Sequence, residues 1–102
     1  MTEDKLLYTT RVHNDQGMKG VAWVEGEDAL QVTTSSPLKP KEAGTNPEQL
    51  IALSWATCLN ATIEIALKRH GIEGVKSEVA IQVNYKLNQE TEISYFEFLV
   101  DI

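Results

Sequence analysis

The feature that most constrains this chain is a long segment of helical character between Asn46 and Gly71. Asn46 is a favourable N-cap, Pro47 suits the first helical position, and Gln49 follows the cap by three residues, as in a capping box. At the other end Gly71 supplies a stop, and the basic sequence KRH before it suits the negative end of the helix dipole. These signals predict a helix from Pro47 to about His70.

This helix is apolar on two opposite sides. At about 100° per residue, the side that carries Cys58 also carries Ile51, Ser54, Trp55, Ala61, Thr62 and Ile65. The opposite side carries Leu53, Ala56, Ile63 and Leu67. A helix of this kind is normally buried on both sides. In a chain of 102 residues one side can lie on a sheet. We therefore expect the other side to need a second layer, from another chain or from sequence absent here.

Five further segments have the composition of β-strands. They are Leu6–Asn14, Val21–Glu25, Ala29–Ser35, Val75–Leu87 and Ile93–Val100. The turn sequences NDQG and GED join the first three, which favours an antiparallel meander. The fourth segment alternates apolar and polar residues in VAIQVNYKL, and NQET turns it back into the fifth as a hairpin. Between meander and helix, Ser36–Thr45 holds two prolines and a glycine and is predicted to be irregular. The order β-β-β-α-β-β predicts one α+β domain over residues 1–102.

Composition and charge exclude several classes of partner. Hydrophobic residues make up 42% of the chain and charged residues 24%, which is typical of a globular protein. The formal net charge of −6 argues against nucleic-acid and anionic-membrane partners, because no basic stripe is available to neutralise phosphates. The apolar run within Leu50–Leu59 is interpreted as too short to span a bilayer, and the N-terminal MTEDKLLYTT lacks the apolar core of a secretory signal.

The cysteine and histidine content narrows the chemistry. A single cysteine, Cys58, cannot form an internal disulfide, which indicates a reducing cytoplasm. His13 and His70 are isolated, so no metal cofactor is expected, and His13 is interpreted as a surface histidine rather than a general base. Trp23, Trp55 and the YFEF sequence are interpreted as core aromatics, with a hydrophobic ligand wall as the alternative.

Two helical residues are candidates for a functional site, and each has a structural alternative. Cys58 is either an inert core thiol or a reactive one; its helical neighbours Ser54 and Thr62 are polar, which favours reactivity modestly. Glu48 is either a first-turn acid that suits the helix dipole or part of a site. Ten residues separate them by about 15 Å along the axis and about 80° around it, so they cannot touch within one helix. A shared site needs a bridging cationic side chain from the strands, or two copies of the helix that cross.

The stretch GTNPEQLIALSWATC resembles the OsmC/Ohr family of cytoplasmic proteins, named for osmotic induction and organic hydroperoxide resistance. In that family a G-T-N-P-E-[QE]-L signature opens a central helix, and the reactive cysteine follows the signature glutamate by ten residues. Glu48 and Cys58 keep that spacing, ATC keeps the small residues before the cysteine, and DALQVTTSSP is similar to the family's third strand. The resemblance implies the OsmC-like fold, with the long helix packed on antiparallel sheet in an intertwined homodimer.

The resemblance also implies an activity, which is the thiol-dependent reduction of organic hydroperoxides in oxidative-stress defence. Cys58 would be the peroxidatic thiolate of this cysteine-based peroxidase, and Glu48 would hold a positive group that activates it. No cofactor is implied, and neither metal nor haem is expected. The electrons would come from an external thiol reductant, a dithiol or a lipoyl-type group.

The chain departs from the family pattern at three places. The family's second, resolving cysteine lies in a C-terminal helix without a counterpart here, so we expect either the N-terminal part of a longer member or a one-cysteine variant. The family arginine is not evident, and the candidates to replace it are Lys19, Lys39, Lys41 and Arg11. Trp55 is bulkier than the residue expected near the thiol. Two alternatives stay open: a non-catalytic dimeric member that binds a hydrophobic small molecule under the helix, and a truncated chain that dimerises but does nothing alone.

Overall fold

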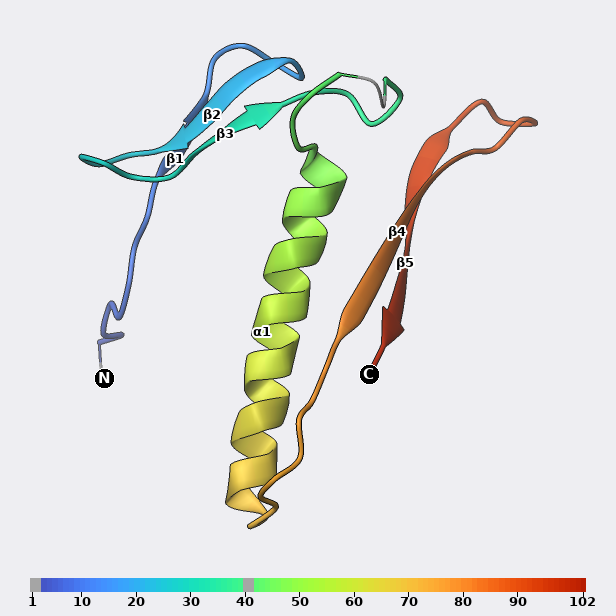
Figure 1. The fold of residues 1–102 in the computed structure, drawn as a ribbon. Helices are drawn as coiled ribbons and strands as arrows, with labels where there is room; N and C mark the ends of the chain where they lie inside the picture. The colour runs from blue at the N-terminus through green and yellow to red at the C-terminus, as the bar shows by residue number, and fades with distance from the viewer. Residues whose placement is uncertain (1–2, 40–41) are drawn as a thin grey trace. The chain divides into compact units, whose positions relative to one another are not determined.

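The computed structural model describes residues 3–39 and 42–102, and the chain divides into two compact units, Met1–Asn46 and Pro47–Ile102. The element order is β1 (Val12–Asn14), β2 (Gly20–Val24), β3 (Gln31–Thr34), α1 (Pro47–Arg69), β4 (Ala80–Leu87) and β5 (Ser94–Asp101), as Figure 1 shows. The predicted order β-β-β-α-β-β and the α+β class are confirmed.

The first unit is the predicted antiparallel meander, with strand order β1-β2-β3. The turn between β1 and β2 is held by Asn14, whose Oδ1 accepts hydrogen bonds from the backbone N–H groups of Gln16 at 3.1 Å and Gly17 at 2.8 Å. β1 is shorter than predicted and begins at Val12 rather than Leu6. The reason is that its partner strand β2 ends at Val24, which pairs with Val12. One further backbone hydrogen bond runs from Glu25 N to Arg11 O, and the chain then turns at residue 26. β2 therefore offers no backbone groups to the residues before Arg11.

The Gly-Thr pair that opens the helical signature lies along the end of β3. Thr45 forms a parallel bridge with Thr34, donates its N–H to Thr33 O at 2.8 Å, and accepts from Ser35 N at 2.8 Å. Thr34 and Ser35 are the most buried residues that the structure describes, each 5% exposed. Gly44 has φ +130°, and a Cβ at this position would lie 2.8 Å from Thr33 O. Only glycine permits this close approach without displacing backbone.

The second unit consists of α1 and the β4–β5 hairpin. α1 ends as the sequence predicts: Gly71 has φ +69°, its N–H bonds to Lys68 O, and Ile72 N bonds to Leu67 O. This pair of bonds is the Schellman arrangement, which satisfies carbonyls that the helix leaves unpaired. In the hairpin, pairing runs from Ala80 opposite Asp101 to Leu87 opposite Ser94.

No hydrophobic side chain among the described residues is fully buried. On the side of α1 that carries Leu53, three other residues are half-buried, namely Ala56, Ile63 and Leu67, whereas Leu53 itself is exposed. On the opposite side, Ile51 and Ile65 are about half exposed, at 51% and 52%.

The prediction of core aromatics is wrong for three residues in this chain, because Trp55 is 40% exposed, Tyr95 44% and Phe96 50%. Trp55 does contact Phe98, with ring centroids 5.3 Å apart. The hairpin covers one part of the helix circumference, so an aromatic beside it is only partly enclosed.

α1 is the one helix in the described part of the chain that is long and apolar enough to cross a membrane by length and composition. The apolar run within Leu50–Leu59 was predicted to be too short to span a bilayer, but apolar residues continue along α1 to Leu67, so this prediction from length was wrong. The central helix of a soluble protein has the same length and composition, and α1 here packs beside β4 within the second unit. Length and composition therefore do not assign α1 to a membrane.

Candidate functional site

Cys58 lies in the middle of α1, eleven residues after Pro47 and eleven before Arg69, and its side chain is exposed. The alternative of an enclosed core thiol therefore does not hold within this chain. The charge effects of a helix terminus fade within its first or last turn. Neither end of α1 can therefore stabilise a thiolate at this position.

The hydroxyl groups beside Cys58 are turned onto the helix backbone. Ser54 Oγ donates to Ile51 O at 2.9 Å, and Thr62 Oγ1 donates to the carbonyl of Cys58 itself at 3.0 Å. A hydroxyl has a single hydrogen to donate, so neither group can also donate to a thiolate in this conformation. Polar neighbours alone therefore do not activate Cys58, and a donor or cation from outside α1 is required.

Glu48 occupies the first turn of α1, as predicted, and one of its oxygens is sequestered. Its Oε2 is buried and has no hydrogen-bond partner within residues 3–39 and 42–102. An unsatisfied buried acceptor costs about 1–3 kcal/mol, and more when it is charged. This oxygen is therefore suited to accept a hydrogen bond from a cationic side chain or a ligand.

The structure places Glu48 and Cys58 on one continuous helix, which fixes their separation at about 15 Å along the axis. They do not meet within one chain. The geometric problem that the sequence raised therefore stands, and a site that uses both residues needs a further group between them or a second copy of α1.

A small apolar pocket of about 150 Å³ adjoins Glu48. It is lined by Pro47, Glu48, Ile51, Val83, Phe96 and Phe98. The aromatic pair comes from β5, where residues two apart point to the same face. The alternation of aromatic and polar residues in YFEF indicated that Phe96 and Phe98 share one face. Their place in the pocket agrees with the alternative that these aromatics form the wall of a hydrophobic ligand site. The contribution of Val83 from β4 depended on the hairpin register, in which Val83 pairs with Phe98.

The four candidate cations all belong to the first unit, whereas Glu48 and Cys58 belong to the second. Lys19 Nζ lies 3.5 Å from Glu42 Oε1, and Arg11 Nε lies 3.8 Å from Glu25 Oε2. The side chains of Lys19 and Arg11 are 75% and 79% exposed, so these ion pairs hold the two cations only weakly. Lys39 is exposed. Lys41 lies outside the described residues.

His13 has structural contacts. Its Nε2 lies 2.8 Å from Glu25 Oε2, and its ring stacks on Trp23 with centroids 5.3 Å apart. Its side chain is 34% exposed, which agrees with a surface histidine in the meander. In residues 3–39 and 42–102 no three His, Cys, Asp or Glu side chains are grouped so that they could hold a metal ion.

Comparison with known proteins identifies the family. The family model described as OsmC-like protein matches residues 39–102. An organic hydroperoxide resistance protein-like chain from Staphylococcus aureus is 29% identical over 92% of this chain and 66% of its own length. A protein of similar name from Staphylococcus saprophyticus is 30% identical over 92% of this chain and 67% of its own length. This chain thus spans about two thirds of the length of these relatives.

Solved structures agree with this result. The organic hydroperoxide resistance protein OhrB of Bacillus subtilis is 26% identical and aligns with a TM-score of 0.76, over 93% of this chain and 70% of its own. A protein from Lactobacillus casei described as a redox protein is 40% identical, with a TM-score of 0.75 over 95% of this chain and 63% of its own. With the family model matching residues 39–102 and the folds agreeing, this chain belongs to the OsmC-like family.

Proposed function

We propose that this protein reduces organic hydroperoxides in the cytoplasm, with Cys58 as the reacting thiol. The observation that carries the proposal is the exposed thiol of Cys58, ten residues after Glu48 on α1, in a chain of the OsmC-like family. Relatives of this chain carry the name organic hydroperoxide resistance protein, which supports the choice of substrate.

The reaction needs one reactive sulfur and an external reductant. The Cys58 thiolate attacks the terminal oxygen of the hydroperoxide; an S–O bond forms as the O–O bond breaks. The sulfur is oxidised to a sulfenic acid, and the departing alkoxide takes a proton to become the alcohol. One thiol of an external dithiol then displaces water from the sulfenic acid, and its second thiol releases Cys58 while the reductant closes to a disulfide. Cys58 is the only cysteine in the sequence, so the second thiol comes from outside this chain.

Activation of the thiolate is assigned to a cation held by Glu48. Ser54 and Thr62 already donate to backbone carbonyls, so the stabilising charge has to come from another residue, and the candidates from the sequence are Arg11, Lys19, Lys39 and Lys41. The Oε2 of Glu48, which has no hydrogen-bond partner among the described residues, is the acceptor proposed for that cation. A charged hydrogen bond contributes about 1.5–3 kcal/mol, so Glu48→Gln should lower the rate of Cys58 oxidation at least about ten-fold.

The partner proposed for the exposed side of α1 is a second copy of this chain. This side carries Ile51, Trp55 and Ile65, each 40% or more exposed, on either side of Cys58. An apolar surface of this kind marks an interface. In sedimentation experiments Ile65→Glu should favour the monomer. The matched control is Val75→Glu, which changes a residue that is 60% exposed outside the helix and should leave the dimer intact. A parent chain that sediments as a monomer would contradict the assignment.

The activity test follows consumption of cumene hydroperoxide with dithiothreitol as reductant. The parent should turn over, and Cys58→Ser should fall to the uncatalysed background. A matched control, Cys58→Ser combined with Ser54→Cys, keeps one thiol on the same side of α1 but one turn earlier. It should also be inactive, because the proposal requires position 58. Unchanged peroxide consumption by Cys58→Ser would refute the proposal.

A second candidate is a non-catalytic dimer that binds a hydrophobic small molecule, which the apolar pocket beside Glu48 favours. A cavity of about 150 Å³ accepts a ligand the size of benzene. Benzyl alcohol matches it, because the ring would contact Phe96 and Phe98 and the hydroxyl would donate to Glu48 Oε2. Calorimetric titration should give binding that survives Cys58→Ser and is lost in Phe98→Ala. Absence of binding to the parent would exclude this second function.

A further inference from the structure

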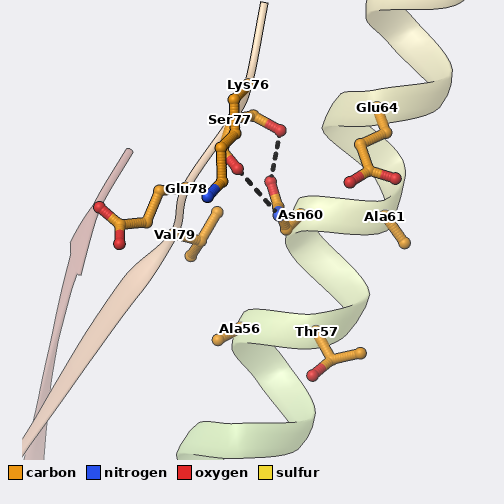
Figure 2. A pocket seen from close by; sticks show the side chains of 9 residues that line it. All are labelled: Ala56, Thr57, Asn60, Ala61, Glu64, Lys76, Ser77, Glu78 and Val79. Carbon is orange, nitrogen blue, oxygen red and sulfur yellow. Dashed lines mark hydrogen bonds between the residues drawn. The ribbon is translucent and has the colours of Figure 1, made fainter.

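A polar contact joins the middle of α1 to the segment that leads into β4. Ser77 Oγ donates to Asn60 Oδ1 at 2.6 Å, and Asn60 Nδ2 donates to the backbone carbonyl of Ser77 at 3.1 Å. Both groups are partly buried. Figure 2 shows the Asn60 carboxamide reaching from the helix to Ser77, with both bonds drawn. The contact is a two-point clamp between residues 17 positions apart.

The apolar contacts around this clamp are small and shallow. Asn60 and Ser77 line an open groove of about 470 Å³ with Ala56 and Val79. One turn towards the start of the helix, Ala52 and Ala56 line a second open hollow with Ile81. Apolar burial is non-directional, so the alanine side chains around this clamp define the rotation of α1 weakly there. The larger apolar contacts with the hairpin, made by Trp55 and Ile51, lie nearer the start of the helix. Hydrogen bonds are directional, and a polar pair within an apolar contact is best attested as a device that fixes register.

The clamp and the reactive thiol face in opposite directions. Asn60 follows Cys58 by two residues, which is about 200° around the helix. Holding Asn60 on Ser77 therefore turns Cys58 away from Ser77, and the Cys58 side chain is exposed. We propose that Asn60 is a positioning residue, whose clamp to Ser77 sets the rotation of α1 on the hairpin and thereby the presentation of Cys58. The proposal rests on the proposed function only in that Cys58 is taken as the reacting group.

Asn60 and Ser77 are matched in chemistry as well as in reach. Ser77 offers one donor, its Oγ–H group, and one acceptor, its backbone carbonyl oxygen. The neutral carboxamide of Asn60 has an oxygen that accepts from the first and an N–H group that donates to the second. Aspartate would keep the acceptor but place a second oxygen opposite the Ser77 carbonyl. Leucine keeps the approximate size of asparagine and removes both bonds. Both substitutions keep the approximate size of the asparagine side chain. Their effects therefore report the loss of hydrogen bonds in the clamp and not a loss of side-chain volume.

The experiment uses two readouts in the folded chain of residues 1–102, neither of which requires peroxide. The first is the rate at which iodoacetamide alkylates Cys58. The second is the emission of Trp55, isolated in a Trp23→Phe background, because the Trp55 ring lies 5.3 Å from Phe98 of the hairpin. Asn60→Leu and Asn60→Asp should each change the alkylation rate by about five-fold, the factor by which one side-chain hydrogen bond shifts an equilibrium. They should shift the Trp55 emission as well.

The matched control is Asn84→Leu. Asn84 is also partly buried, and its Nδ2 donates to Glu97 Oε1 at 2.8 Å, but this bond lies within the hairpin. The Asn84→Leu variant should therefore give the same alkylation rate and the same Trp55 emission as the parent. Parent-like alkylation and emission in a folded Asn60→Leu chain would overturn the proposal, and so would equal changes in Asn84→Leu.

If Asn60→Leu does not fold, Ser77→Ala decides the question. It removes the 2.6 Å bond and leaves the carbonyl in place, and Ser77→Thr restores the hydroxyl. The proposal requires both readouts to move in Ser77→Ala and to return in Ser77→Thr. If the alkylation rate and the Trp55 emission do not change as expected, the clamp proposal fails but the proposed peroxidase function is not affected. If the chain has no peroxidase activity, these two measurements still test the clamp.

Discussion

Replacing Gly44 with alanine tests how the signature segment is attached to β3. Gly44 holds φ +130°, and an added Cβ would lie 2.8 Å from Thr33 O and 3.2 Å from the carbonyl carbons of Thr33 and Thr34. These are backbone atoms of the strand end, so they cannot turn aside as the tip of a flexible side chain would. The substitution must displace the strand or the segment, and with it the backbone bonds that Thr45 makes to Thr33 and Ser35.

The expected loss has two parts. An alanine forced to positive φ costs about 1–2 kcal/mol. Forcing extra atoms into a packed position adds about 1–3 kcal/mol. The free energy of unfolding should therefore fall by about 2–5 kcal/mol, which is a large fraction of the stability of a small domain. Hydrogen exchange at the N–H groups of Ser35 and Thr45 should accelerate, because these bonds close the segment onto β3.

The assay is urea unfolding with the m-value held as a check on two-state behaviour. Gly17→Ala is the matched control, since Gly17 lies in the same unit with φ +73° and its Cβ would meet nothing within 4 Å. It should lose only the backbone part, about 1–2 kcal/mol. Equal losses in the two variants would refute the steric argument, because they would leave the close approach to Thr33 without any energetic effect.

Three smaller predictions follow from the turns and the hairpin. Glu92→Gly should raise the free energy of unfolding by about 1 kcal/mol in urea, because Glu92 holds φ +60°, where glycine is unstrained; a loss would contradict this. Gly71→Ala should lower thermal stability, followed by circular dichroism, by about 1 kcal/mol at the C-terminus of α1, and no change would argue against the Schellman end. Hydrogen bonds from Asn84 and Lys86, and the charge of Lys86, hold the pKa of Glu97 below its ordinary value of 4.5. Its contribution to stability is therefore present above pH 4.5 and lost as the pH falls through the lower folded-state pKa, so Glu97→Gln should flatten the acid limb of unfolding curves measured against pH.

The helix was predictable because its signals are local. Pro47 begins α1, and Gly71 closes it with the expected bonds, since caps and turns depend on neighbouring residues. The existence of the hairpin was predictable for the same reason, because alternation and a turn sequence mark it, but β4 begins at Ala80 rather than at the predicted Val75. The start of β1 was not, because Leu6–Asn14 is uniformly β-prone and pairing depends on where the partner strand ends. Strand length is a property of two segments, and the composition of one cannot set it.

The sequence predicts candidate residues for the site but not their contacts. The spacing of Glu48 and Cys58 follows from helix geometry alone. The donation of the Thr62 hydroxyl to the Cys58 carbonyl is a rotamer choice that residue type leaves open. Asn60 belongs to no sequence motif, and its partner Ser77 lies across a connection that carries no motif either. Such long-range polar pairs become visible only when the packing of the helix on the hairpin is known.

The signature GTNPE divides into positions that local structure requires and one that it does not. Gly44 is required by the close approach to Thr33, and proline is favoured at position 47 by the first turn of the helix, whereas Thr45 bridges to Thr34 through its backbone. Glu48 is different: its buried Oε2 lacks a partner in the described residues and so destabilises the fold in isolation. A first-turn acid that served only the helix dipole would be as effective with both oxygens in water. Burial of that oxygen is therefore best explained by a group that binds it, which is why Glu48→Gln should affect the reaction more than the stability of α1.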